Sequence, residues 1–238
     1  MRFQGKSRLG FYPLPFSEAQ RIRQFLWFPN AASSSAIDPC VGDGVAFELI
    51  SNGPEALRYG IELGAYRAEQ AKQRIPNIVE GNTVEVQCPV ECVGLLYLNP
   101  PCDWTLGPAD SRLTEQSFLS HTYRWLKPGG VLLFVIPSDR LTECGQILSS
   151  HFRDVRVYRL EAPECVRYKQ VVVIGARRTR REKERLTDSN ITRARLYYAS
   201  LARNPSQIPV LPSEPDARYD VPVSGPAQLV YRGLPWTK

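Results

Sequence analysis

Two short motifs combine residue types that could bind a nucleoside cofactor and position an amine. The first, Asp38-Pro-Cys-Val-Gly-Asp-Gly44, follows an apolar run, and Glu62 ends the next such run, twenty residues after Gly42. Glycines let the backbone turn tightly beside a ligand, and a carboxylate at this distance can accept both hydroxyls of a ribose. The loop lacks the third glycine of dinucleotide-binding loops, and Asp43 would repel a pyrophosphate. It therefore favours a cationic sulfonium cofactor, with an ordinary glycine turn beside a surface Glu as the alternative.

The second motif, Leu98-Asn-Pro-Pro-Cys-Asp-Trp104, follows a later apolar run. Parallel sheets bind ligands where their strands end. The two prolines fix the backbone and have no N–H, so the Asn99 amide oxygen and the Pro100 carbonyl become fixed acceptors. Two acceptors aimed at one NH₂ group would orient its lone pair toward an electrophile, so catalysis would come from positioning and electrostatics. A rigid turn after a strand is the alternative interpretation.

Strand-like and helix-like segments alternate over the first 176 residues, which predicts an α/β fold. Most of the strand-like segments are continuous apolar runs, as expected for strands buried on both faces. They are residues 35–38, 58–62, 77–80, 93–98, 131–136, 155–160 and 170–176, and the helix-like segments between them are 44–52, 65–74, 114–125 and 140–149. Because a short connection joins the last two strands, we expect a Rossmann-like, doubly wound sheet of seven mostly parallel strands with an antiparallel last strand.

Both ends of the chain extend this pattern. Ser17-Glu-Ala-Gln20 predicts a capping box at the start of an amphipathic helix. After the last strand, residues 177–203 resemble one basic helix. Seven prolines in residues 204–238 exclude a long helix or a central strand there. We therefore expect a catalytic domain of residues 1–178, a basic helical segment of 179–204, and an extended Pro-rich arm of 205–238 that packs on a surface or a partner.

Taken together, the motifs resemble those of class I S-adenosylmethionine-dependent methyltransferases, specifically the N6-adenine DNA methyltransferases with an Asn-Pro-Pro-aromatic motif. Phe11-Tyr-Pro-Leu-Pro15 resembles the family's Tyr-Pro-Thr-Pro element, and Lys127-Pro-Gly-Gly-Val131 followed by Ile136-Pro137 resembles its turn and fifth strand. The resemblance covers residues 8–178 and implies S-adenosylmethionine as the cofactor. It implies cofactor contacts from Tyr12, Pro13, Asp38, Cys40, Gly42, Gly44, Glu62, Asn82 and Asn99, and catalytic roles for Asn99, Pro100, Pro101 and Cys102.

Three residues depart from the family pattern. Leu14 stands where Thr is usual, and Asn82 where Asp is common. Cys102 stands where an aromatic ring normally stacks on the target base, an interaction of about 1–3 kcal/mol. We expect Trp104 or Tyr168 to supply the missing ring.

The net charge of +6 is concentrated in one segment. Residues 1–176 carry 18 basic and 18 acidic residues, residues 177–203 carry nine and three, and residues 204–238 carry three and three. A basic stripe with interleaved Tyr197 and Tyr198 is typical of a surface that contacts a phosphate backbone, and a solvated helix is the alternative. We expect Arg180 and Arg181 to contact DNA.

The favoured function is methyl transfer to adenine N6 in DNA. RNA adenine and a protein glutamine remain open as substrates, and so does a non-catalytic, methyltransferase-like nucleic-acid-binding subunit. The 60 residues after 178 are too few for a base-reading domain, so either sequence specificity is short or absent, or a partner protein supplies it. The longest apolar run, Val131 to Ile136, is too short to span a bilayer, and the N-terminus lacks a secretory signal. We expect a cytoplasmic protein with reduced thiols.

The remaining Cys, His and Trp residues are expected to be structural. Cys88 and Cys92 lack a second ligand pair nearby, which argues against zinc. His121 and His151 are expected to have surface or capping roles. Trp27 and Trp125 are expected in the core.

Overall fold

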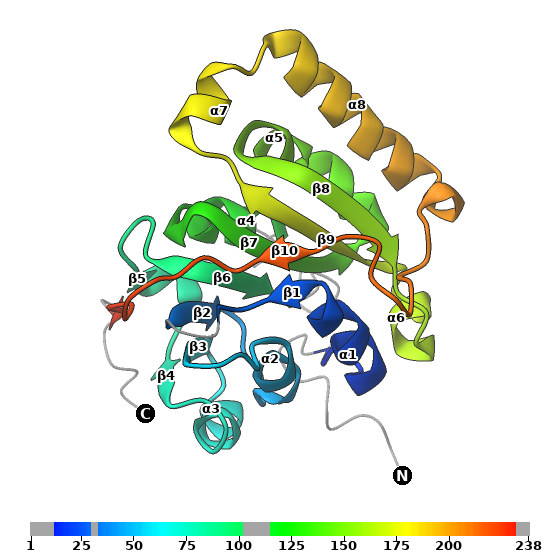
Figure 1. The fold of residues 1–238 in the computed structure, drawn as a ribbon. Coiled ribbons are helices and arrows are strands. Elements are labelled where there is room, and N and C mark those ends of the chain that lie inside the picture. The colour runs from blue at the N-terminus through cyan, green and yellow to red at the C-terminus, as the bar shows by residue number, and fades with distance from the viewer. Residues whose placement is uncertain (1–11, 30–32, 102–114, 232–238) are drawn as a thin grey trace.

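The structure, a computed structural model, describes residues 12–29, 33–101 and 115–231. A seven-stranded sheet forms the centre of the fold, in the order β4-β3-β2-β6-β7-β9-β8 (Figure 1). Its strands are β2 (Ser34–Asp38), β3 (Ala56–Glu62), β4 (Asn77–Glu80), β6 (Val93–Leu98), β7 (Leu126–Pro137), β8 (Phe152–Arg159) and β9 (Gln170–Arg177). The neighbouring pairs from β4 to β7 are parallel, whereas β9 runs antiparallel to both β7 and β8. The predicted α/β class with an antiparallel last strand is confirmed.

Helices cover both faces of this sheet because the central strands are apolar on both faces. One core cluster joins a face of the sheet to α1 (Phe16–Gln24), α2 (Val45–Ile50) and α3 (Ala65–Lys72). The other joins the opposite face to α4 (Glu115–Thr122), α5 (Leu141–His151) and α8 (Asp188–Arg203). Shorter elements complete the described chain, namely α6 (Pro163–Arg167), α7 (Arg180–Glu184), the 3₁₀ turns η3 (Thr83–Glu85), η5 (Tyr123–Trp125), η6 (Ser138–Arg140) and η7 (Pro205–Gln207), and the two-residue strands β1 (Leu26–Trp27), β5 (Val86–Gln87), β10 (Tyr219–Asp220) and β11 (Val230–Tyr231).

The described part of the Pro-rich arm is extended and packs on the chain itself (Figure 1). It passes β8 at Val210, pairs with β1 through β10, and then pairs with β5 through β11. Between these pairings, the Ser224 hydroxyl accepts the backbone N–H of Ser35 at 2.6 Å, at the start of β2. Leu211, Tyr219 and Val221 are buried in the first core cluster. The arm therefore completes one face and the amino-terminal edge of the sheet.

The N-terminal capping box is a wrong prediction. Helix α1 begins at Phe16 after Pro15, and no side chain caps it. Ser17 lies inside the first turn, and the adjacent Glu18 turns into the core instead. Its Oε1 accepts the backbone N–H groups of Glu161 at 2.8 Å and Ala162 at 2.7 Å. The acidic residue of the apparent box thus fastens the helix to a distant loop.

The single basic helix is also corrected. The structure has two helices there, because Thr179 and Thr187 each form a capping box, with Glu182 and Asn190 respectively. The second box starts a new helix and separates α7 from α8.

Arg177 belongs to β9 rather than to a surface helix. Its side chain is buried, donates to the carbonyls of Arg124 and Leu126, and pairs with Glu91 at 3.2 Å. Burial lowers the pKa of Arg177. This charge is therefore structural.

The two tryptophans differ in burial. Trp125 is buried as predicted, but Trp27 is 42 % exposed and its ring lies under the Arg218 guanidinium at 4.3 Å. The prediction for Trp27 is wrong because β1 is a two-residue strand whose Trp27 side faces solvent. No helix within the described residues is long and apolar enough to cross a membrane.

Candidate active site

The glycine-rich loop connects β2 to α2 at the carboxyl ends of the parallel strands. Gly42 and Gly44 have φ values of 59° and 81°, in the left-handed region that side chains disfavour. The Val41 N–H donates to the Ile61 carbonyl on β3 at 3.0 Å. This bond and the two glycines hold the loop beside the end of β3, where Glu62 stands.

The Glu62 carboxylate accepts hydrogen bonds from both the glycine-rich loop and the start of α3. Its side chain is 6 % exposed, and its Oε2 accepts the Gly42 N–H at 3.0 Å. Its Oε1 accepts the Gly64 N–H at 2.7 Å and two Arg67 N–H groups, from Nε at 2.9 Å and Nη2 at 2.6 Å. The structure thus joins the predicted loop and the predicted acidic residue in one hydrogen-bonded unit.

Asp38 and Cys40 lie at the base of the same loop. Asp38 Oδ1 accepts the Cys40 N–H at 2.8 Å. Burial, with a contribution from the Glu62 charge, raises the pKa of Asp38 well above its ordinary value. Burial, followed by the charges of Asp38 and Glu62, likewise raises the pKa of Cys40, so that its thiol stays protonated. Crowded carboxylates favour a cationic ligand over an anionic one.

Asn82 follows β4 at the same edge. Its Oδ1 accepts the Val84 N–H at 3.3 Å, and the neighbouring Thr83 hydroxyl donates to the Pro39 carbonyl of the glycine-rich loop. Sequence reasoning missed two apolar side chains here, Leu63 and Val84, which are 48 % and 37 % exposed. Their positions in the sequence could have indicated them, because Leu63 directly follows Glu62 and Val84 is two residues after Asn82.

The second group lies at the end of β6. Asn99 Nδ2 donates to the Tyr12 carbonyl at 3.1 Å. The Tyr12 ring packs against Tyr168 with a centroid distance of 4.4 Å, tilted by 52°. Tyr168 ends α6 just before β9, whose Gln170 pairs with Pro137 at the end of β7. Three predicted residues from distant parts of the chain are therefore neighbours.

The other predicted residues of this group vary in placement. Pro100 is buried, Pro101 is half-buried and Pro13 is exposed. Leu14 is buried in the core, so its departure from the family's Thr gives a packing residue. Cys102 and Trp104 lie outside the described residues.

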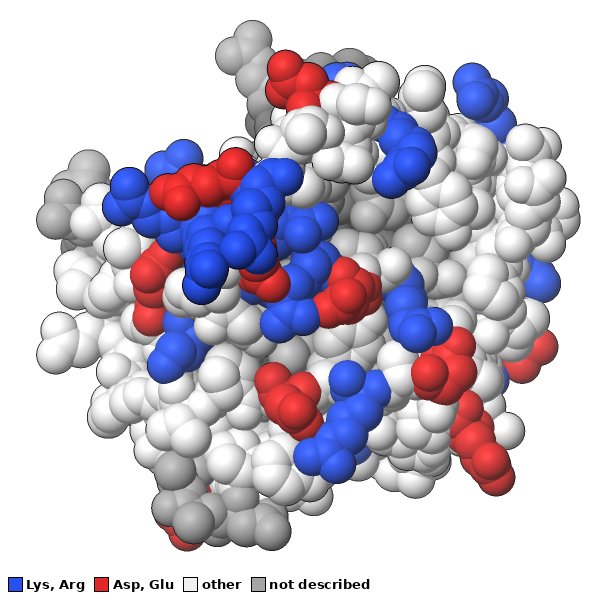
Figure 2. Space-filling view, turned by 45° about the horizontal axis from the view of Figure 1, so that its top comes forward, with Lys and Arg blue, Asp and Glu red and all other residues white. Residues whose placement is uncertain are grey.

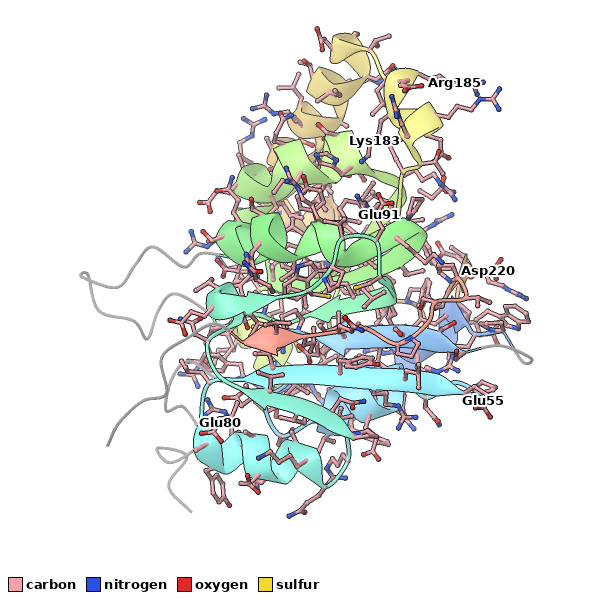
Figure 3. All side chains as sticks on the ribbon, turned by 90° about the vertical axis from the view of Figure 1, so that its left-hand side faces the viewer. Glu55, Glu80, Glu91, Lys183, Arg185 and Asp220 are labelled. Atoms are coloured by element: carbon pink, nitrogen blue, oxygen red, sulfur yellow. The ribbon has the colours of Figure 1, made fainter. Side chains whose placement is uncertain are left out.

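The structure does not bring Arg180 and Arg181 to this site. Because β9 is antiparallel, it ends at the edge where β7 begins, and α7 follows it there. In Figure 3, Glu80 at the end of β4 and Arg185 just after α7 lie on opposite sides of the molecule. Figure 2 shows basic side chains gathered over α7, with acidic ones among them. Arg180 pairs with Glu184 at 3.0 Å although its own side chain is 94 % exposed.

The remaining cysteine pair is close in space. The Sγ atoms of Cys88 and Cys92 are 3.0 Å apart. Within the part of the chain that the structure describes, no group of three or more His, Cys, Asp or Glu side chains could hold a metal ion.

Comparisons with known proteins agree with this architecture. The profile of an uncharacterised methyltransferase family (DUF6094) matches residues 1–224. No sequence among the curated proteins matches the chain. The solved structure of a predicted O-methyltransferase from Agrobacterium tumefaciens is 16 % identical, with 68 % of this chain and 81 % of that chain covered and a TM-score of 0.50.

Two further similar structures are restriction–modification proteins. A type I methyltransferase subunit from Streptococcus thermophilus is 16 % identical, with 81 % of this chain and 53 % of that chain covered and a TM-score of 0.55. The M protein of the type I restriction enzyme EcoKI is also 16 % identical, with 71 % and 44 % covered and a TM-score of 0.57. This chain spans about half the length of each, and the likeness at this identity is one of fold.

Proposed function

The chain belongs to the uncharacterised methyltransferase family (DUF6094) and is an S-adenosylmethionine-dependent methyltransferase, and we propose that it methylates the N6 amine of adenine in DNA. The observation that carries the proposal is the fixed amide of Asn99, which is bonded to the backbone of Tyr12, whose ring packs against Tyr168. A backbone carbonyl can only accept, so the bond to Tyr12 assigns Nδ2 as the donor and Oδ1 as the acceptor of this amide. A planar substrate carrying an NH₂ group fits an acceptor next to an aromatic face.

Asn99 and Pro100 would hold the substrate amine. The Asn99 Oδ1 and the Pro100 carbonyl would each accept one N–H, which orients the nitrogen lone pair. S-adenosylmethionine, when bound, supplies the electrophilic methyl group. The half-buried Tyr168 would stack on the base in place of the aromatic residue that Cys102 replaces, and the base would have to leave the duplex stack to reach it.

The residues around the glycine-rich loop fit the cofactor. Glu62 Oε2 accepts one N–H and keeps a lone pair for a ribose hydroxyl. The exposed side chains of Leu63 and Val84 offer apolar surface to a purine. Burial and the Glu62 charge disfavour the ionised form of Asp38, so a ligand with positive charge, such as a sulfonium, would stabilise this pair of acidic residues.

DNA is the favoured substrate because the Asn99-Pro-Pro motif resembles that of N6-adenine DNA methyltransferases, and two of the similar folds belong to type I restriction–modification systems. The described arm is used in packing on the chain's own sheet, and α8 packs on α5. Within the described residues neither is a separate base-reading module, so we assign sequence recognition to a partner protein.

The test is transfer of a labelled methyl group from S-adenosylmethionine to DNA, RNA or protein. We expect label in adenine of DNA, and loss of at least a hundredfold in rate for Asn99→Ala because both an acceptor and the Tyr12 contact disappear. Asn204→Ala, which removes an exposed amide bonded weakly to the Ser200 carbonyl, is the matched control and should leave the rate unchanged. Label found only in RNA, or only in a protein glutamine, would show that the substrate is that molecule and not DNA.

The non-catalytic alternative needs its own measurement. Calorimetry with S-adenosylhomocysteine should show binding to the parent chain. Binding without transfer to any of the three substrates, alone or with cell extract as a source of partner protein, would refute the proposed reaction. Absence of both would support a methyltransferase-like scaffold.

A further inference from the structure

A groove on the opposite side of the molecule is not used by the proposed reaction. It has a volume of about 590 Å³ and lies between the end of α5, the residue after β9 and the first half of α8. It is lined by Ser149, Arg178, Leu186, Asn190, Arg193, Ala194 and Tyr197. This volume is in the range of small-molecule sites.

Two polar atoms of this groove are buried without a partner. The Ser149 hydroxyl is on a side chain only 4 % exposed and makes no hydrogen bond within the described residues. The Nε of Arg178 is also buried and makes no hydrogen bond within the described residues. Buried polar groups in folded proteins are nearly always hydrogen-bonded, so unpartnered donors that line a cavity indicate a ligand that accepts from them.

The groove also carries positive charge that no ion pair within the described residues neutralises, although the charge of Glu182 acts on Arg178 from a greater distance. Within the described residues, neither Arg178 nor Arg193 has a carboxylate in ion-pair contact, whereas Arg180 and Arg153 are paired with Glu184 and Glu182. The Asn190 Oδ1 is held by Thr187, at 2.7 Å from its hydroxyl, so the amide's free groups are the N–H donors. Two guanidinium groups, a hydroxyl and an amide form a set rich in donors, as a phosphate requires.

The phosphate ligand would also meet an aromatic ring. Tyr197 is 54 % exposed at the groove, and Leu186 and Ala194 provide apolar surface beside it. The carboxylates of an acidic peptide could bind the arginines but would not stack on the Tyr197 ring, whereas every nucleobase has a π-face that stacks on Tyr. We propose that this groove binds a nucleotide unit, with its phosphate on Arg178 and Arg193 and its base against Tyr197.

This site is distinct from the methyl-transfer site. The groove begins where β9 ends, at the amino edge of the parallel strands, while Asn99 and Glu62 stand at their carboxyl ends. Nucleotide binding there needs no methyl transfer. The ligand could be a free nucleotide or one unit of a nucleic-acid strand, since the chemistry is the same.

The experiment is calorimetry on the full chain at low salt with saturating S-adenosylhomocysteine, which blocks the cofactor site. Thymidine monophosphate and a single-stranded oligothymidylate are the two probes. We expect Arg193→Gln and Arg178→Gln each to weaken binding at least tenfold, and Tyr197→Ala several-fold. Binding of both probes, or of the oligothymidylate alone, supports the proposal, and the second result identifies a strand as the source.

The matched control is Arg195→Gln, an exposed arginine on the same helix that does not line the groove. It should change affinity less than twofold, and all variants should melt within a few degrees of the parent. Equal weakening by Arg195→Gln and Arg193→Gln would overturn the proposal, as would binding of neither probe or competition by a polyglutamate peptide at equal strength. Inorganic phosphate binding as tightly as thymidine monophosphate would overturn the role of Tyr197. Because Asn99→Ala should bind both probes normally, failure of this site and failure of the proposed reaction are separable.

Discussion

Replacing Glu62 by Gln tests whether this carboxylate holds the cofactor ribose. Each carboxylate oxygen offers two lone pairs. Oε1 already faces three N–H donors, one from Gly64 and two from Arg67, whereas among the described residues Oε2 faces only the N–H of Gly42. One lone pair, on Oε2, is therefore available to a ribose hydroxyl while Arg67 stays in place.

Glutamine removes this acceptor while keeping the shape. Its amide has a single oxygen, which the Gly64 and Arg67 donors would claim, so the NH₂ group would face the Gly42 N–H. A hydrogen bond to a charged group contributes about 1.5–3 kcal/mol, which corresponds to roughly 10- to 150-fold in dissociation constant. We expect S-adenosylhomocysteine to bind Glu62→Gln more weakly by that factor. Leaving the Gly42 N–H unpartnered should lower the free energy of unfolding by about 1–3 kcal/mol.

Calorimetry gives the affinity, urea unfolding gives the stability, and Arg67→Ala is the control. That variant keeps the carboxylate and its two backbone donors and frees lone pairs on Oε1, so the affinity should be unchanged or higher. Two results would refute the reasoning. The first is a folded Glu62→Gln variant that binds S-adenosylhomocysteine within twofold of the parent. The second is an equal loss in Arg67→Ala, which would mean that order in the loop, rather than the acceptor, sets the affinity.

Three further variants test other parts of the structure. Burial, then the charge of Lys183, lowers the pKa of His151 from 6.5 to about 4, so the folded state favours the neutral ring. The free energy of unfolding, measured with urea, should therefore fall by at most about 2 kcal/mol, after solvent screening, as the pH is lowered from about 6.5 to 4. The His151→Gln variant should flatten this pH profile. Tyr219→Ala removes a ring 5 % exposed and a hydroxyl bonded to the Asp154 carbonyl, and should cost about 3–5 kcal/mol, against less than about 0.5 for Val223→Ala on the exposed side of the arm. Gly44→Ala should lower the free energy of unfolding by about 1–2 kcal/mol, because a φ of 81° disfavours any residue with a Cβ. Steric overlap should add little, because the new Cβ would lie 3.4 Å from the Ala71 Cα. Unchanged thermal unfolding would mean that the loop backbone changes conformation in the variant.

The sheet could be predicted because its strands carry their own pattern. The 131–136 run is apolar throughout and is buried on both faces, and the short connection before Gln170 explains why β9 runs antiparallel to β8. Helix ends were harder to predict. Ser17-Glu-Ala-Gln20 satisfies the capping pattern, but Glu18 gains three donors from Glu161, Ala162 and Arg21 by turning inward. A long-range contact of this kind leaves no trace in local sequence.

In the candidate site, too, local motifs could be predicted from sequence, whereas long-range contacts could not. Residues next to one another in the chain, such as Gly42 and Gly44, could be located from the loop pattern alone. The contact between Tyr12 and Tyr168 depends on the fold of the 155 residues between them, and only the expectation of a replacement ring suggested Tyr168. Arg67 was not predicted, because its role follows from the helical turn that places it over Glu62, five residues earlier.

Net charge illustrates what the fold adds to composition. The excess of +6 is assigned by sequence to residues 177–203, a sum that already subtracts their three acidic residues, yet Arg177 is buried, so fewer positive charges lie at the surface than the count implies. Arg178 and Arg193, which have no ion pair with a described carboxylate, stand at the amino ends of the parallel strands, and Asp38 and Glu62 stand at the carboxyl ends. One edge therefore suits a sulfonium and the other a phosphate. The six residues of β6 span roughly 20 Å, more than the Debye length of about 8 Å at physiological salt, so we expect each ligand to bind with little influence from the charge at the other site.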